Sequence, residues 1–254
     1  MAEQSREVYV EPSVEQATGL ASKFVKAIVT EAVGRHGFCY LALAGGTTPH
    51  GLYLRLASDG LSGDMPWQNV EVFFGDERDV PQDHVASNYR MAQRTLLDHV
   101  PIELMHVHPM PADADNIQSS AAEYEQAIRK AVPADEQGIP RFDLILLGMG
   151  ADGHTVSLFP NTEAIEETQK LVVAYHVPVL GRSRMRITFP LINAARNVIL
   201  FITGLDKADA VAKFLGNDPT ARAELPISRV NPTCGNFKII LDAAAARAAN
   251  LKFM

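Results

Sequence analysis

The sequence predicts an α/β fold in which a mostly parallel sheet is covered by helices on both faces. Short apolar segments of strand length alternate with amphipathic segments of helix length along the chain. The apolar run at residues 142–147 does not alternate with polar residues, as is typical of a strand buried on both faces. No repeat, linker or shift in composition divides the chain, so we expect one domain over residues 1–254.

The expected helices follow from hydrophobic spacing and from residues that begin or end helices. Residues 14–33 repeat apolar side chains at spacings of three and four, and Gly34 and Gly37 end that helix. Pro49 begins the second helix, because proline is favoured in a first turn. Further helices are expected from residues 87–89, at 115–132, 191–196 and 206–215, and in the alanine-rich tail from residue 242.

The expected strands are short apolar stretches, several of which end in glycine. The clearest lie at residues 40–44, 70–74, 142–147 and 197–203. Shorter or weaker ones are expected at residues 105–108, 171–177, 185–189, 226–230 and 237–241.

Composition excludes some classes of partner. The 254 residues have a formal net charge of −7, which argues against a surface for nucleic acid or anionic membranes. No apolar run is long enough to span a bilayer, and residues 1–6 are polar with no signal-peptide core after them. Cys39 and Cys234 have neither metal nor disulfide spacing and are expected to be buried and reduced. We therefore expect a cytoplasmic protein.

Four predicted strands end in polar residues, and the carboxyl ends of parallel strands share the edge where ligands bind. Two of these ends suit an anion. Residues 45–49 (Gly-Gly-Thr-Thr-Pro) join a strand to a helix N-terminus, which favours a single phosphate; the alternative is an ordinary tight turn. Lys207 lies in the first turn of an expected helix, where a bound anion would offset its unfavourable position; the alternative is a surface lysine.

The other two strand ends carry groups suited to chemistry. After the strand at 142–147, Asp152 and His154 stand one glycine apart, the arrangement of an imidazole base oriented by a carboxylate. A polar turn that caps a helix is the alternative. Asp76 and Arg78 follow the strand at 70–74 and suit a substrate hydroxyl and an anion, unless they form a solvated ion pair.

Two more clusters are weaker candidates. His106 and His108 would share one face of a strand, but no third metal ligand is evident, so we expect no metal site. Arg182, Arg184 and Arg186 alternate along an expected strand, and we expect Arg186 or Arg182 to reach the anion; a solvated edge strand is the alternative.

The motifs at residues 44–49, 74–78, 87–89, 148–160, 186–188 and 204–208 stand in the order found in a known family. The chain resembles the 6-phosphogluconolactonase family over roughly residues 8–250, and the Gly-Met-Gly-Ala-Asp-Gly-His block at 148–154 is highly specific for it.

The resemblance implies a three-layer α/β/α modified Rossmann-like fold and a cytosolic role in the pentose phosphate pathway. It implies hydrolysis of a phosphosugar lactone, 6-phospho-D-glucono-1,5-lactone, with no cofactor and no obligatory metal. We expect no nucleic-acid or membrane partner, and a monomer or weak homodimer. His154, oriented by Asp152, would activate water. Substrate binding is expected from Gly45, Gly46, Thr47, Thr48, Asp76, Arg78, Gly150, Arg182, Arg186 and Lys207.

Two alternatives stay open at this point. The wider superfamily includes glucosamine-6-phosphate deaminase/isomerase, which carries a glutamate five residues after the histidine. Here that position is Phe159, which counts against the deaminase. The second alternative is a non-catalytic sugar-phosphate sensor. The Asp152/His154 pair argues against it, because a sensor needs only the phosphate loop.

Overall fold

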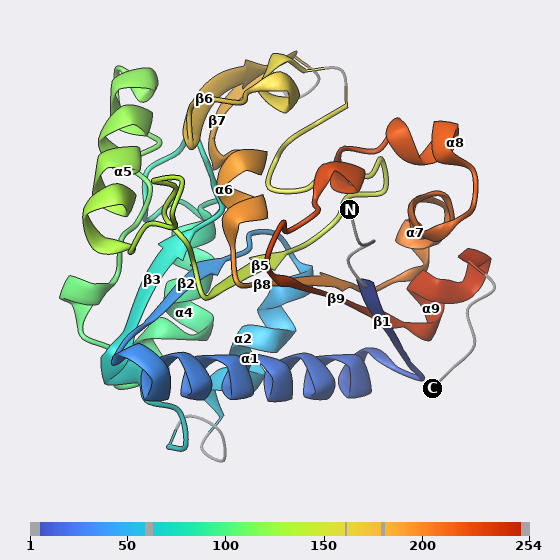
Figure 1. Cartoon of the computed structure of the whole chain (residues 1–254), viewed down its shortest axis with the longest axis horizontal. Helices are drawn as coiled ribbons and strands as arrows, with labels where there is room; N and C mark the ends of the chain where they lie inside the picture. Colours follow the sequence, from blue (N-terminus) through green and yellow to red (C-terminus); the bar gives the residue numbers. More distant parts are fainter. Residues whose placement is uncertain (1–5, 59–62, 161, 179–180, 250–254) are drawn as a thin grey trace.

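The centre of the molecule is a six-stranded sheet. The computed structural model describes residues 6–58, 63–160, 162–178 and 181–249. The strand order is β1-β9-β8-β5-β2-β3, and every neighbouring pair is parallel (Figure 1). These strands are β1 (Arg6–Glu11), β2 (Cys39–Leu43), β3 (Val70–Phe74), β5 (Leu144–Leu147), β8 (Asn197–Ile202) and β9 (Asn236–Asp242). The predicted fold class is confirmed.

Helices cover both sides of this sheet. Figure 1 shows α1 along one side, and α5 and α6 on the other. The Ser13 side chain caps α1 by accepting a hydrogen bond from the Gln16 N–H, and Gly37, with φ 90°, ends it. None of the described helices is long and apolar enough to cross a membrane. The helices are α1 (Val14–His36), α2 (Thr48–Ala57), α4 (Asn88–Thr95), α5 (Ile117–Ala131), α6 (Phe189–Ala194), α7 (Ala208–Leu215), α8 (Pro219–Ala223) and α9 (Ala243–Ala246).

A second, antiparallel sheet stands beside the carboxyl end of β3. It has the order β4-β7-β6, with β4 (Asp76–Arg78), β7 (Arg182–Ile187) and β6 (Val172–Val177). Gly75 joins the two sheets: its N–H donates to the β2 carbonyl of Leu43, and its own carbonyl accepts from the N–H of Ile187. The charged residues after β3 are therefore a strand, where the sequence suggested only the end of one.

Several sequence predictions are wrong in detail. A strand was expected at residues 226–230, but Pro226–Arg229 form a 3-10 turn, in which the Ile227 N–H donates to the Gly153 carbonyl. Residues 104–106 are also a 3-10 turn, and only Val107 forms a bridge, to Val72 of β3. One-turn 3-10 segments lie at Trp67–Asn69, Leu97–His99, Leu104–His106, Glu163–Glu166, Leu205–Lys207, Pro226–Arg229 and Arg247–Ala249.

Other differences concern the two ends of the chain and one cysteine. The strand β1 and the helix α8 were not anticipated; β1 is a mostly half-buried edge strand with charged residues at both ends. Cys39 is buried as expected, but Cys234 is exposed, because it lies in the loop before β9 and not in a strand. The polar start at residues 1–5 and the end of the expected tail helix, 250–254, lie outside the described residues.

Candidate active site

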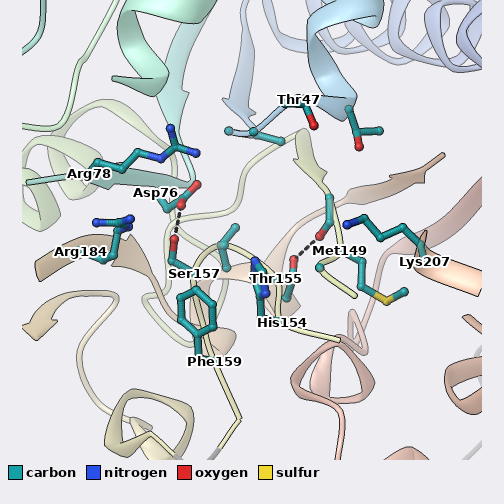
Figure 2. Close-up of a pocket in the computed structure, with 17 residues that line it drawn as sticks. Thr47, Asp76, Arg78, Met149, His154, Thr155, Ser157, Phe159, Arg184 and Lys207 are labelled. Carbon is teal, nitrogen blue, oxygen red and sulfur yellow. Dashed lines mark hydrogen bonds between the residues drawn. The ribbon is translucent and has the colours of Figure 1, made fainter. Parts of the chain in front are cut away.

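A cavity of about 290 Å³ lies at the carboxyl edge of the parallel sheet (Figure 2). All four predicted strand ends contribute to its wall, so their expected convergence is confirmed. From the sequence prediction it contains Gly45, Gly46, Thr47, Thr48, Asp76, Arg78, Gly150, His154 and Lys207. The remaining lining residues are Ala44, Gly148, Met149, Thr155, Val156, Ser157, Phe159 and Arg184.

The loop after β2 forms one end of the cavity. It leads into α2, whose first N–H groups have no partners within the helix and attract anions. Gly46 has φ 88°, a conformation that favours glycine. A Cβ atom on Gly45 would lie 2.1 Å from Nδ2 of Asn88, so the loop needs glycine there. Lys207 lies in the 3-10 turn before α7, and its Nζ is 2.8 Å from the Asp206 carboxylate.

The residues of β4 alternate between two environments. Asp76 and Arg78 line the cavity, whereas Glu77 points into the protein. Oε1 of Glu77 accepts from the N–H of Asn88, and Oε2 accepts from the N–H of Tyr89, both at 2.8 Å. Burial raises the pKa of Glu77, although these hydrogen bonds act in the opposite direction. Glu77 therefore anchors the start of α4.

His154 and Asp152 form a hydrogen-bonded pair beside the cavity. Nδ1 of His154 lies 2.5 Å from Oδ1 of Asp152, and the imidazole is partly exposed. Burial alone would raise the pKa of the Asp152 carboxyl, but its hydrogen bond to His154 and its electrostatic interaction with that ring outweigh burial, so this pKa lies below its ordinary value. The carboxylate thus fixes the imidazole and leaves Nε2 available for chemistry.

Gly150 makes room for this imidazole. A Cβ atom at Gly150 would lie 2.1 Å from Nδ1 of His154, so a side chain there would displace the ring. The Gly150 N–H donates to the His154 carbonyl at 2.9 Å and is already occupied. Gly150 therefore contributes space beside the base, while its expected contact with substrate stays a prediction.

The three arginines of β7 differ in burial and in their position relative to the cavity. Arg184 lines the cavity beside Arg78, with which it is paired across β4 and β7. Arg186 is completely buried, and Arg182 is exposed, and neither lines the cavity. Burial and the neighbouring Arg78 lower the pKa of Arg184. The expectation that Arg186 or Arg182 reaches the ligand is therefore wrong, because alternate spacing along a strand does not show how deeply each residue is buried.

Two further lining residues were missed. Ser157 donates a hydrogen bond to the Asp76 carboxylate, and the Phe159 ring lies 4.3 Å from the His154 ring between centroids. Ser157 was marked only by its place in the 148–160 block, and Phe159 also as the position where the deaminase carries a glutamate. Their contacts arise from a turn at residues 155–158 that periodicity does not reveal.

The described residues offer no metal centre at this edge or elsewhere. No group of three or more His, Cys, Asp or Glu side chains within them is arranged to hold a metal ion. His106 and His108 both hydrogen-bond to Glu71 of β3 instead, through Nδ1 of His106 at 2.7 Å and Nε2 of His108. These contacts attach the 104–108 segment to the outer strand of the sheet.

Comparison with known proteins identifies the family. The family model described as "Glucosamine-6-phosphate isomerases/6-phosphogluconolactonase" matches residues 12–239. A 6-phosphogluconolactonase from Synechocystis sp. is 40% identical over 217 residues, which cover 85% of this chain and 87% of the relative. The solved structure of 6-phosphogluconolactonase from Trypanosoma brucei has a TM-score of 0.83 at 27% identity and covers 96% of this chain and 99% of its own.

The fold alone does not separate the two activities in the family's name. A monomeric glucosamine-6-phosphate deaminase has a TM-score of 0.79 at 20% identity, covering 95% of this chain and 99% of its own. The curated lactonases are more similar in sequence. This chain belongs to the glucosamine-6-phosphate isomerase/6-phosphogluconolactonase family.

Proposed function

We propose that this chain hydrolyses 6-phospho-D-glucono-1,5-lactone to 6-phospho-D-gluconate, the lactonase step of the pentose phosphate pathway. Relatives 34–40% identical over most of the chain carry the name 6-phosphogluconolactonase. The observation that carries the proposal is the His154–Asp152 pair with the Phe159 ring packed on its imidazole. The deaminase has a glutamate at the position of Phe159, so this site has one oriented base without that second acid.

The cavity has cations on both sides of the proposed base. Figure 2 shows Arg78 and Arg184 on one side of His154 and Lys207 on the other, with Thr47 above. The reaction product carries a phosphate at one end and a carboxylate at the other. Cations at both ends suit such a molecule, although the whole chain is acidic.

The phosphate docks at the α2 end, in this proposal. The N–H groups at the start of α2, the hydroxyls of Thr47 and Thr48, and the Lys207 ammonium form a cluster of donors there. The phosphate takes no part in bond breaking. Its binding energy holds the lactone carbonyl near His154. Asp76 binds a sugar hydroxyl.

The chemical step uses the free nitrogen of the imidazole. Nε2 of His154 removes a proton from a water molecule as that water attacks C1 of the lactone. The resulting oxyanion is stabilised by the guanidinium groups of Arg78 and Arg184. When the tetrahedral intermediate collapses, the C1–ring oxygen bond breaks and protonated His154 returns its proton to that oxygen.

The oligomeric state and the cellular location of the protein complete the proposed function. We propose a monomer or weak homodimer as the active form. We also propose a cytoplasmic location, in keeping with a metabolic step on a small phosphosugar.

A direct assay tests this function. The lactone is generated in situ, and its loss is followed above spontaneous hydrolysis for the wild type, His154→Ala and His176→Ala. His176 is an exposed residue of β6 outside the cavity, so it serves as the control. We expect His154→Ala to lower kcat about 10²–10⁴-fold and His176→Ala to leave it unchanged.

Glucosamine 6-phosphate is assayed beside the lactone. Ammonia release from the amino sugar, without lactone hydrolysis, would establish the deaminase and overturn the proposal. Binding of the phosphosugar with no turnover of either compound would leave a sensor.

A further inference from the structure

The floor of the cavity contains a turn with an unusual backbone. Val156 has φ 40° and Ser157 has φ 57°, the only non-glycine residues with positive φ among those described. The turn closes through a hydrogen bond of 2.6 Å from the Leu158 N–H to the Thr155 carbonyl. A β-branched residue such as valine is a rare outlier in this region. Such strain persists only where the surroundings hold it, and it is concentrated at functional sites.

The surroundings hold this turn from several directions. The Thr155 hydroxyl donates to the Gly148 carbonyl at 2.8 Å. The Val156 side chain packs so tightly on Gly75 that a Cβ on Gly75 would lie 3.0 Å from Cγ1 of Val156.

Two side chains donate hydrogen bonds to the carbonyl of Ser157. One donor is Nη1 of Arg186, and the other is the Tyr175 hydroxyl, at 3.4 Å.

The guanidinium group of Arg186, which holds the Ser157 carbonyl, is buried at a cost in desolvation free energy. This group is completely buried, with its carbon 3.8 Å from the centroid of the Tyr175 ring. Nε and Nη2 have no acceptor in hydrogen-bonding geometry among the described residues. Burial lowers the pKa of Arg186 to about 10, against the opposing effects of Tyr175 and Asp76, so it stays charged at neutral pH. A buried charge of this kind adds little net stability, so stability alone does not account for Arg186.

The turn places a hydroxyl on a cavity carboxylate. Oγ of Ser157 donates to Oδ2 of Asp76, while Nδ2 of Asn88 lies 3.3 Å from Oδ1 of the same carboxylate. Asp76 is thereby held from two sides. The strained conformation is what turns Ser157 so that its carbonyl faces Arg186 and its hydroxyl faces Asp76.

We propose that Arg186 is a positioning residue of the lactone-hydrolysing site, which holds the turn at residues 155–158 in its left-handed conformation and so fixes the Ser157 hydroxyl on Asp76. Arg186 is not among the residues that line the cavity, and its side chain is buried. The inference rests on the proposed function. It replaces the direct contact with substrate that the sequence suggested for this arginine.

The first test is Arg186→Met, which keeps an unbranched apolar stem and removes the guanidinium group with its charge. We expect kcat per folded enzyme to fall about 10²-fold, the effect of a misplacement of about 1 Å. Inhibition by inorganic phosphate should not change, because the phosphate site is intact. Arg182→Met, on the exposed end of the same strand, is the matched control and should behave as the wild type. Weaker phosphate inhibition with unchanged kcat would show that Arg186 binds substrate, and the proposal would be wrong.

A second variant separates the effect of the turn's backbone conformation from the effect of the Ser157 hydroxyl. Ser157→Gly keeps the left-handed conformation, which glycine adopts freely, and removes the bond to Asp76. It should lower kcat as well. The double variant should be no slower than the slower single one, because both changes break the same chain of contacts. Losses that multiply would mean that Arg186 acts by another route.

A crystal structure of Arg186→Met tests the proposal without depending on the enzymatic activity of the protein. A 155–158 turn that leaves the left-handed region and loses the Asp76 contact supports the proposal. An unchanged turn overturns it, whether or not the wild type proves to be a lactonase. Wild-type enzyme without lactone hydrolysis would overturn only the proposed function.

Discussion

Neighbouring charged side chains in this protein have opposite roles because strand geometry separates them. Asp76 and Arg78 face the cavity, and Glu77 between them lies inside. The same alternation on β7 places three arginines on one face, where their depth then decides which of them meets a ligand. Arg184 is the one at the cavity. At the scale of the residue, one position along a strand separates a ligand contact from a buried support.

The pH profile reports on His154. The pKa of Asp152 lies below its ordinary value, so its carboxylate stays ionised in mildly acidic solution. We therefore expect kcat/KM to fall on the acidic side through uptake of one proton, by the imidazole, which must be neutral to act as a base. Rates corrected for spontaneous hydrolysis measure this limb. A profile that stays flat through mild acid, or an unchanged limb in His154→Ala, contradicts the imidazole base.

Lys207→Ala should weaken binding of the phosphate. Loss of a charge-assisted hydrogen bond of about 1.5–3 kcal/mol raises KM and the inhibition constant of inorganic phosphate about 10- to 150-fold. Lys213→Ala, an exposed lysine of α7 outside the cavity, is the control. Kinetics on the phosphorylated lactone and on gluconolactone without phosphate make the measurement. An equal loss on both substrates would show that Lys207 is not a phosphate ligand.

At the scale of the element, hydrophobic patterns predicted the parallel sheet well. Strand β3 was predicted at its observed bounds, and α1 begins where the apolar spacing begins. The antiparallel sheet was missed in its pairing because β4 is three charged residues and its partner lies more than a hundred positions away. Asp76 pairs with Arg186 and Arg78 pairs with Arg184, and this register joins segments that are distant in the sequence. Local sequence patterns do not predict which distant segments pair as strands.

The phosphate loop depends on its contact with α4. In Gly45→Ala the new Cβ would lie 2.1 Å from Nδ2 of Asn88, so Asn88 must move away from Asp76. We expect a loss of about 1–3 kcal/mol in stability, together with weaker phosphate inhibition. Denaturant unfolding and inhibition kinetics measure the two effects.

Gly51→Ala is the matched control in α2. A Cβ at Gly51 meets no atom within 4 Å, so alanine should stabilise the helix by about 0.5–1 kcal/mol. Equal behaviour of the two variants would show that the contact between Gly45 and Asn88 has no importance.

At the scale of the whole molecule, the location of the site could be predicted from the sequence, but the buried residues that hold its wall in place could not. The rule that ligands bind at the carboxyl ends of parallel strands brought together segments from residue 45 to residue 207. The buried Arg186 and the turn at 155–158 depend on packing between the two sheets. Alternation suggested that Arg186 meets the ligand, and the fold places it one layer deeper.

The sheet predicts a single unfolding transition, in keeping with the expectation of one domain. Strand β1 pairs with β9, so residues near both ends of the sequence share one sheet. We expect fluorescence of Trp67, which is buried, and far-UV circular dichroism to change together on heating, with equal calorimetric and van't Hoff enthalpies. Two separated transitions would show that the chain contains independent units.

The pairing of β1 with β9 also has a consequence for synthesis. Within the described residues, the first strand has one sheet neighbour, and that neighbour spans Asn236–Asp242 near the end of the 254-residue sequence. A ribosome delivers β1 long before its partner exists. The growing chain must therefore carry an unpaired strand until β9 has been synthesised, and such an open edge can pair wrongly with other strands.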